Sequence, residues 1–443
     1  MIKWNAGSAN LRSAFEMNTM SALALSFLAV LFTTPAVAAD DPARTSFHFS
    51  FGTGKIAADT IRVSSNTFYD KERGYGFEPG SEVKEGEGAV TCEHLFYFSV
   101  AVPEGNYKVT ATLGDNQAAS VTTIKAELRR LMVEKVTIAA GKAEQRTFIV
   151  NIRTPRISGG GEVRLKPREK AGEARAWDEK LTLEFTNSHP ALRSLEIERV
   201  THIPTIYIAG DSTSTDQPVE PFNSWGQMLT RFLKPDIAIA NHGESGESLR
   251  SFFGEKRFDK IISLIRQGDY LLIQMGHNDQ KDTTPGAGPF TSYKDFLKQM
   301  VTAARDKGAT PVLITPVNRL TLDSDGKITN SLGDFPEAVR QVAKEHRVAL
   351  IDLNAMSKLF YEALDPVGSH KAFAGKDTTH HSNYGSYELA KCIVQGILDA
   401  KLPLAAHIIG DFHGFDPAHP DPLSNFDIPA EPARGSAERP LGN

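Results

Sequence analysis

The chain has 443 residues, which favours two to three domains over one. Its 40% hydrophobic and 23% charged residues are typical of a globular protein with enough apolar side chains to bury a core in each half. The formal net charge of −5 argues against non-specific nucleic-acid binding, which needs basic patches.

The N-terminus has the charged, apolar, small-residue order of a secretory signal peptide. Lys3 and Arg12 precede an apolar stretch at 20–32, and a small-residue stretch ending at Ala38 and Ala39 follows. A membrane anchor is the rival interpretation, but the stretch is shorter than the ~20 residues of a spanning helix. We therefore expect residues 1–39 to be a signal peptide cleaved near Ala38/Ala39. The mature protein is then secreted or periplasmic and contacts no membrane.

Residues 45–200 show short runs in which apolar and polar residues alternate, separated by Gly, Pro, Asn and Asp. This period-two pattern predicts antiparallel strands and a β-sandwich. Such runs occur at 47–51, 95–100, 107–113 and 181–185. The glycine-rich, charged stretch 159–170 is interpreted as a loop. Three aromatic residues could stack on a sugar, although aromatics in a sandwich more often belong to the core: Tyr69, Tyr75 and Phe77.

After Pro204 the rhythm changes to alternating strands and helices, which predicts a parallel sheet with helices on both faces over residues 204–402. Strands are expected at 205–209, 237–240, 270–275, 311–315 and 348–353. Helices are expected near 225–233, 258–266, 293–307, 335–345 and 384–400. The Pro- and Asp-rich tail, 403–443, is expected to be extended or partly disordered.

Four short motifs fall just after predicted strands or before the last helix, and the carboxyl ends of parallel strands share one rim of a sheet. They are Gly210-Asp211-Ser212, the stretch 241–248, Gly276-His277-Asn278-Asp279 and Asp377-Thr378-Thr379-His380. A serine hydroxyl needs a base to take its proton, and an imidazole needs a carboxylate to hold its tautomer. This predicts a triad of Ser212, His380 and Asp377.

A tetrahedral oxyanion also needs preorganised donors. The backbone N–H groups of Ser212 and Gly246, with the Asn278 carboxamide, are the candidates. Gly243 competes with Gly246, and Asn278 could merely cap the next segment. Ser212 alone is indistinguishable from an ordinary turn serine, so the interpretation depends on all four motifs together.

These motifs resemble the SGNH, or Gly-Asp-Ser-Leu, hydrolase superfamily over residues 204–402. Within it, the stretch 209–213, Ser224-Trp225-Gly226 and the last two motifs resemble rhamnogalacturonan acetylesterases. The resemblance implies a flavodoxin-like three-layer α/β/α fold, esterase chemistry, and the triad and oxyanion roles given above. One departure is Glu247, where this branch often has Arg, which leaves the polysaccharide open. Residues 45–200 are more loosely similar to galactose-binding-like, jelly-roll modules.

The expected substrate is an acetylated plant cell-wall polysaccharide, rhamnogalacturonan or pectin, with acetylxylan or another hemicellulose ester as the alternative. A carbohydrate-binding protein with an incidental esterase fold is the rival from another class. Four residues are candidate substrate contacts, each with a core or surface role as the competing interpretation: Trp225, His277, Arg250 and Arg319.

No cofactor or metal is expected. His370, His380 and His381 lack the regular spacing of a zinc site, and the Asp-x-x-His spacing selects His380 over His381 as the base. Cys392 lies in an apolar helical pattern, which predicts a buried free thiol, while a disulfide to Cys92 stays open. The oligomeric state is left open as well.

Overall fold

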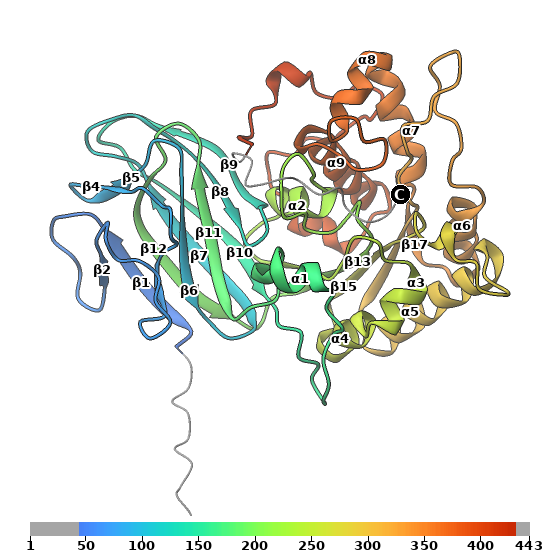
Figure 1. The fold of residues 1–443 in the computed structure, drawn as a ribbon, viewed down its shortest axis with the longest axis horizontal. Coiled ribbons are helices and arrows are strands. Elements are labelled where there is room, and N and C mark those ends of the chain that lie inside the picture. The colour runs from blue at the N-terminus through green and yellow to red at the C-terminus, as the bar shows by residue number, and fades with distance from the viewer. Residues whose placement is uncertain (1–43, 431–443) are drawn as a thin grey trace, which may run out of the picture. The chain divides into compact units, whose positions relative to one another are not determined.

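The computed structural model describes residues 44–430 of the chain (Figure 1). The predicted signal peptide, residues 1–39, lies outside the described residues. Among the helices of the described part, none combines the length and the apolar character that crossing a bilayer requires.

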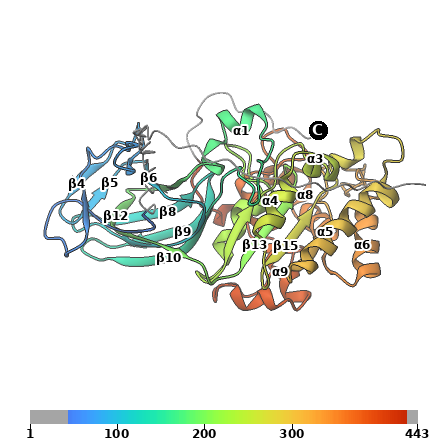
Figure 2. The same cartoon turned by 90° about the horizontal axis from the view of Figure 1, so that it is seen from below.

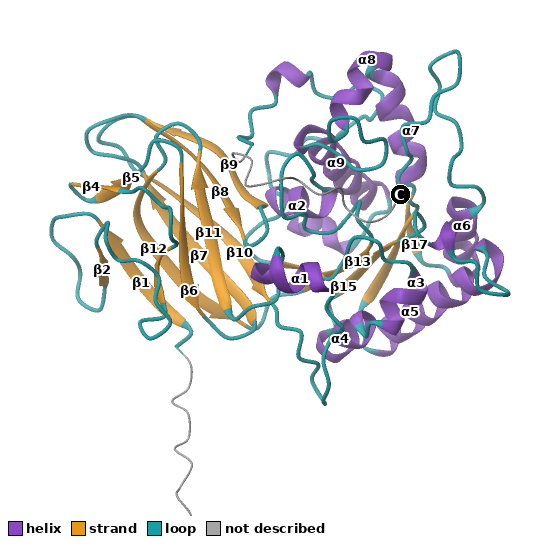
Figure 3. Cartoon of the chain, viewed as in Figure 1, coloured by secondary structure: helices purple, strands orange, loops and turns teal. Residues whose placement is uncertain are grey.

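Residues 46–200, the β region, form two β-sheets that enclose an apolar core (Figure 3). One sheet has the order β10-β7-β12-β1-β2, with β5 on β12 and β4 on β5; the other has the order β3-β6-β11-β8-β9. The pairs are antiparallel except for β1 with β2. The strands are β1 Ser46–Phe51, β2 Ile61–Val63, β3 Tyr75–Phe77, β4 Lys84–Gly86, β5 Ala89–Thr91, β6 Leu95–Ala101, β7 Gly105–Leu113, β8 Ser120–Ala126, β9 Arg130–Ile138, β10 Glu144–Ile152, β11 Lys180–Thr186 and β12 Ala191–Val200.

The core between these sheets is rich in phenylalanine, as the alternating pattern requires. Phe49, Phe77 and Phe98 are fully or almost fully buried, and the Phe98 ring meets the other two edge to face. Phe77 therefore cannot stack on a sugar, which corrects one candidate. Tyr75 packs against the same core, and Tyr69 lies under the Lys180 ammonium group.

The stretch between β10 and β11 departs from the predicted loop, because it contains the short helix α1, Pro167–Ala171. Pro167 supplies the fixed backbone angle suited to a first helical turn. The Glu169 carboxylate accepts the Lys166 N–H at 2.8 Å and closes that turn. Glu169 is fully buried, so a stretch that reads as solvated charge is in fact anchored.

Residues 204–402, the α/β region, contain five parallel strands in the order β14-β13-β15-β16-β17. Numbered within this region, the order is 2-1-3-4-5, that of flavodoxin-like folds, which places the switch point between the first and third strands. Those strands are β13 and β15. The bounds are β13 Thr205–Gly210, β14 Ala238–Asn241, β15 Tyr270–Gln274, β16 Thr310–Ile314 and β17 Ala349–Ile351.

Helices cover both faces of this sheet (Figure 2). Their buried side chains form two separate apolar clusters with it. One cluster joins α2, α7 and α9 to one face, and the other joins α3, α4, α5 and α6 to the opposite face. The predicted α/β/α architecture, preceded by a β-rich region, is therefore confirmed. The helices are α2 Trp225–Leu229, α3 Leu249–Gly254, α4 Arg257–Leu264, α5 Lys294–Asp306, α6 Phe335–His346, α7 Leu353–Ala363, α8 Asp365–Ser369 and α9 Asn383–Asp399.

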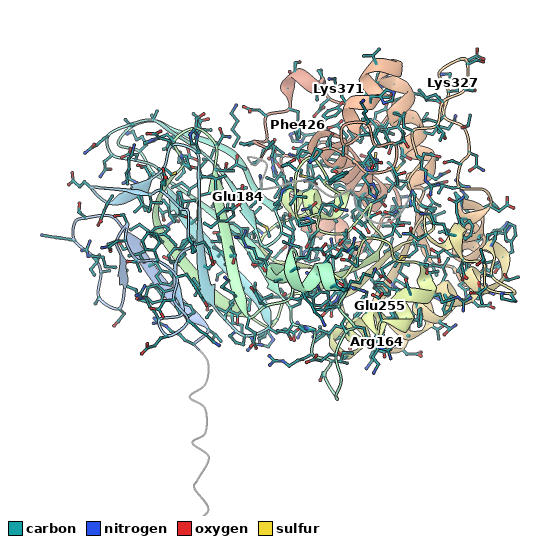
Figure 4. All side chains as sticks on the ribbon, in the orientation of Figure 1. Arg164, Glu184, Glu255, Lys327, Lys371 and Phe426 are labelled. Atoms are coloured by element: carbon teal, nitrogen blue, oxygen red, sulfur yellow. The ribbon has the colours of Figure 1, made fainter. Side chains whose placement is uncertain are left out.

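The described part of the C-terminal tail, residues 403–430, packs against both regions. Its Phe426 ring lies 5.7 and 5.6 Å from the rings of Tyr384 and Tyr387 (Figure 4). The Pro429 carbonyl accepts a hydrogen bond from Lys125 of β8 at 3.1 Å. Within residues 44–430 the tail is thus ordered by contacts rather than extended in solvent. Elsewhere, Cys92 and Cys392 are both buried free thiols.

Candidate active site

The Gly-Asp-Ser motif begins at Gly210, the last residue of β13, at the switch point of the sheet. A Cβ at Gly210 would lie 1.8 Å from the Ser214 Oγ and 3.1 Å from the Gln274 carbonyl oxygen, so a larger residue would displace the Ser214 side chain and press on the neighbouring strand. The Asp211 carboxylate accepts the N–H and hydroxyl of Thr213 at 3.0 and 2.8 Å. This tight turn fixes Ser212 at the carboxyl end of the strand.

Ser212, His380 and Asp377 form one continuous chain of hydrogen bonds. The Ser212 Oγ lies 2.9 Å from the His380 Nε2, and the His380 Nδ1 lies 2.9 Å from the Asp377 Oδ2. The other Asp377 oxygen accepts the backbone N–H groups of Thr379 and His380 at 2.7 and 3.0 Å. The carboxylate is therefore held by its own loop while it orients the imidazole.

The structure separates His380 from its neighbour. His381 Nε2 lies 2.7 Å from the Tyr361 hydroxyl, and its ring packs 4.8 Å from that of Phe373. Burial, and then the neighbouring His380, lower the pKa of His381 to about 3, so it stays neutral. His381 is a packing and hydrogen-bonding residue, as the spacing argument predicts.

The loop after β14 distinguishes the two candidate glycines. The Gly243 N–H donates to the Asn241 Oδ1 at 3.1 Å and is already used. Gly246 has φ +81°, which favours glycine. Among the described residues, the N–H groups of Ser212 and Gly246 donate to no protein acceptor. Both remain available to an oxyanion.

Asn278 follows β15 and lies beside this loop. Its Nδ2 donates to the Glu247 carbonyl at 3.0 Å, which uses one of its two N–H bonds. The Lys281 ammonium lies 3.4 Å from its Oδ1, consistent with the amide orientation in which Nδ2 faces the loop. Gly246, Ser248 and Asn278 line one cavity of about 340 Å³ together with Arg250, Ser251, Lys281 and Asp282.

Comparison with known proteins agrees with this geometry. Residues 208–386 match the GDSL-like lipase/acylhydrolase family. The rhamnogalacturonan acetylesterase RhgT of Bacillus subtilis (strain 168) is 39% identical over 219 residues, which cover 46% of this chain and 94% of that protein. The chain belongs to the GDSL-like lipase/acylhydrolase family. It is accordingly a carboxylic ester hydrolase.

Other relatives of this GDSL-like chain extend the comparison. The probable rhamnogalacturonan acetylesterase YesY of the same organism is 37% identical over 219 residues, covering 46% of this chain and 97% of that protein. The uncharacterized esterase YxiM of B. subtilis is 28% identical over 370 residues, which cover 79% of this chain and 90% of that protein. The crystal structure of the B. subtilis protein of that name has 24% identity and a TM-score of 0.45, covering 81% of this chain and 99% of that chain.

His277 contacts the Gly-Asp-Ser turn and is not among the residues that line the cavity beside Gly246. Its Nδ1 is 3.2 Å from the Asp211 Oδ2, and both residues are fully buried. Burial alone would raise the pKa of Asp211, but the adjacent His277 and the bonds from Thr213 hold it below its usual value. His277 therefore contacts the Gly-Asp-Ser turn and acts as a support for it.

Two other predicted substrate contacts are placed elsewhere. Trp225 is fully buried in the core under α9, where its indole N–H donates to the Gln274 Oε1 at 2.5 Å. A fully buried side chain is not exposed to a substrate, which corrects that candidate. Arg319 donates to the Gln280 side chain and to the carbonyl of His277 at 2.8 and 3.3 Å, so it braces the Gly-His-Asn-Asp turn. Arg250 alone of these residues lines the cavity, paired with Asp282 at 2.7 Å.

One group of described acidic residues has the spacing of a metal site, because carboxylate oxygens of Glu169, Glu173 and Glu244 lie within 4.8 Å of one another. Each, however, has a cationic partner. Glu169 pairs with Arg257, and Arg168 pairs with both Glu244 and Glu173. We therefore interpret the group as part of an ion-pair network.

Several residues at the site belong to none of the four sequence motifs. Gln217 donates to the Ser212 carbonyl at 2.7 Å and to the Ser245 Oγ at 3.3 Å, which links the first two motifs. Lys281 contacts Asn278, as described above. Lys166 and Arg168 come from the β region and reach the same loop. A local pattern cannot find Lys166 and Arg168, because their partner Ser245 is 79 and 77 positions away in the sequence.

Proposed function

We propose that this chain is a serine acetylesterase that removes O-acetyl groups from a plant cell-wall polysaccharide through an acetyl-enzyme. The observation that carries the proposal is the unbroken chain from Asp377 through His380 to the Ser212 hydroxyl, with contacts of 2.9 Å at each step. A serine without such a base is a poor nucleophile. The intact chain also argues against a carbohydrate-binding protein with an incidental esterase fold.

The proposed reaction begins when Ser212 Oγ attacks the acetyl carbonyl carbon while its proton moves to His380 Nε2. Negative charge develops on the carbonyl oxygen, where the N–H groups of Ser212 and Gly246 and the Asn278 amide stabilise it. The tetrahedral intermediate collapses, and the sugar oxygen leaves with the proton from His380. Water then loses a proton to His380 and attacks the acetyl-enzyme, which releases acetate and restores Ser212.

Rhamnogalacturonan is the proposed polymer, supported by two relatives with that substrate in their names, at 39% and 37% identity. The cavity beside Gly246 and Asn278 adds a chemical argument, since Arg250 and Lys281 line it. Cationic side chains suit the carboxylate of a uronic acid next to the acetylated position. The apolar N-terminal stretch further supports a secreted or periplasmic location, where such a polymer is met.

The test is acetate release from a panel containing acetylated rhamnogalacturonan, acetylated homogalacturonan and acetylxylan, with p-nitrophenyl acetate as a small ester. We expect the highest kcat/KM on rhamnogalacturonan and no release by Ser212→Ala. Arg250→Ala should raise KM on the uronate polymers and leave p-nitrophenyl acetate unchanged. If the wild type released acetate from none of these, the esterase proposal would be wrong; a preference for acetylxylan would refute only the polymer.

A further inference from the structure

A segment of the β region makes contact with the loop that carries Gly246. The segment lies between β10 and β11 and includes α1. Lys166 Nζ donates to the Ser245 carbonyl at 2.9 Å, and Arg168 Nη2 donates to the same oxygen at 2.5 Å. A carbonyl oxygen has two lone pairs and can accept both bonds. Two cations from one region therefore converge on a single peptide of the other.

That peptide is the one whose nitrogen belongs to Gly246. It is planar and trans, so its C=O and N–H bonds point in opposite directions. Binding the Ser245 oxygen from one side fixes the peptide plane and turns the Gly246 N–H to the other side. Charge-assisted bonds to a carbonyl also polarise the peptide, which strengthens its N–H as a donor.

The acidic residues around this peptide hold the two cations in place. Arg168 pairs with Glu244, and Lys166 pairs with Glu247, one residue on either side of the Ser245–Gly246 pair. Glu247 is itself held by the Ser251 hydroxyl at 2.6 Å. The ion pair with Lys166 gives a physical reason for a glutamate at position 247.

Buried contacts anchor the short helix α1 and so hold Lys166 and Arg168 in place. Glu169 accepts the Trp177 indole N–H at 3.0 Å and pairs with Arg257 of α4, with all three side chains buried. Arg164 N–H donates to the carbonyl of Glu255, labelled with Arg164 in Figure 4, at 2.9 Å. The segment is thus fixed to the α/β region on both sides of the converging cations.

We infer that Lys166 and Arg168 are positioning residues of the oxyanion hole, which orient and polarise the Gly246 N–H through the Ser245 carbonyl. The inference rests on the proposed esterase function. It gives the β region a part in the chemical step, separate from any binding of glycan. If the contact only stabilised the fold, the ion pairs with Glu244 and Glu247 would be sufficient. Lys166 and Arg168 would not both need to donate to the Ser245 carbonyl oxygen.

The test compares Lys166→Met and Arg168→Met with Lys170→Met, an exposed cation on the same helix. Rates are measured on p-nitrophenyl acetate and normalised to the folded fraction. We expect kcat to fall about tenfold in each of the first two variants, less than the ~10²-fold or more for deleting a donor. KM should change by less than about threefold, because the bond matters only in the transition state. Lys170→Met should match the wild type.

A second readout separates positioning from stability. A phenylboronic acid forms a tetrahedral adduct with the serine, and its dissociation constant should rise by the same factor as kcat falls. Arg168→Lys should recover most of the loss. Lys166→Met removes the nearest cation from the buried Glu247, which keeps only the more distant Arg257 at 3.9 Å, and this loss can unfold the chain. The paired variant Lys166→Met with Glu247→Gln therefore keeps the test open. It should fold and retain the kcat defect.

Unchanged kcat and boronate affinity in folded Lys166 and Arg168 variants would overturn the inference while leaving the esterase intact. Losses that appear only as a smaller folded fraction would overturn it as well. A wild type that neither hydrolyses esters nor binds the boronate would refute the proposed function, and the inference with it. The failures are therefore distinguishable.

Discussion

Replacing Asn278 tests the oxyanion hole most directly, because the structure fixes which way its amide points. The Asn278 Nδ2 donates to the Glu247 carbonyl at 3.0 Å, and its second N–H is free for the substrate oxygen. Asn278→Ala removes that donor. By analogy with other oxyanion donors, kcat should fall about 10²–10³-fold, equivalent to about 2.7–4 kcal/mol of transition-state stabilisation. KM should stay within about threefold of the wild type.

Asn278→Asp makes a sharper comparison, since it keeps the size of the side chain and replaces donors by acceptors. At pH 8 its carboxylate would face both the Glu247 carbonyl and the developing oxyanion, and both contacts would be repulsive. We therefore expect Asn278→Asp to be less active than Asn278→Ala. Initial rates on p-nitrophenyl acetate measure both, with Gln280→Ala as a neighbouring control. An aspartate variant as active as the alanine variant, or an alanine variant within threefold of the wild type, would refute the reasoning.

Three further predictions follow from buried charges. Asp377→Asn should lower kcat about 10⁴-fold with little change in KM, because the amide favours the wrong imidazole tautomer; a loss below tenfold would contradict the triad. Burial raises the pKa of the Asp279 carboxyl to about 7, whereas in the unfolded state this pKa has its ordinary value of 3.8. Between these two pH values the folded state holds a proton that the unfolded state has lost. The free energy of unfolding of the wild type should therefore fall as the pH rises from about 4 to 7. Measured by urea unfolding, Asp279→Asn should be more stable than the wild type by a few kcal/mol at pH 8, and no more stable at pH 4. Arg129→Met leaves the paired Glu220 uncompensated, which should lower the free energy of unfolding by about 3–5 kcal/mol; a change below 1 kcal/mol would contradict this.

The fold and the hydrogen-bonded arrangement of Ser212, His380 and Asp377 could be predicted because their signals are local or repeat along the chain. Alternation identifies the strands of the β region, and buried runs followed by polar motifs identify β13 and β15. Asp377 and His380 share one loop, so their spacing predicts that their side chains meet, as they do at 2.9 Å. The helices α3 and α8 were not predicted, because six and five residues are too few to show an apolar period. The 11-residue helix α7 was missed although its sequence is amphipathic.

The contacts between the two regions could not be predicted from the sequence. Lys166 lies in a charged stretch that is typical of a solvated surface, and its partner Glu247 is 81 positions away in the second motif. The prediction that Trp225 contacts substrate was wrong for a different reason. An aromatic residue at a helix start can face a pocket or the core, and only the position of α9 shows that it faces the core.

The paired charges between the β and α/β regions also have an evolutionary consequence. Arg130 and Arg168 from the β region neutralise Asp216 and Glu244, which are buried in the α/β region. RhgT aligns over 94% of its length with less than half of this chain and so has little length left for a β region. Inheriting the acidic side chains without the arginines would leave these charges without their partners. Across the family, these four positions should therefore covary, and the acidic residues should be replaced wherever the β region has been lost.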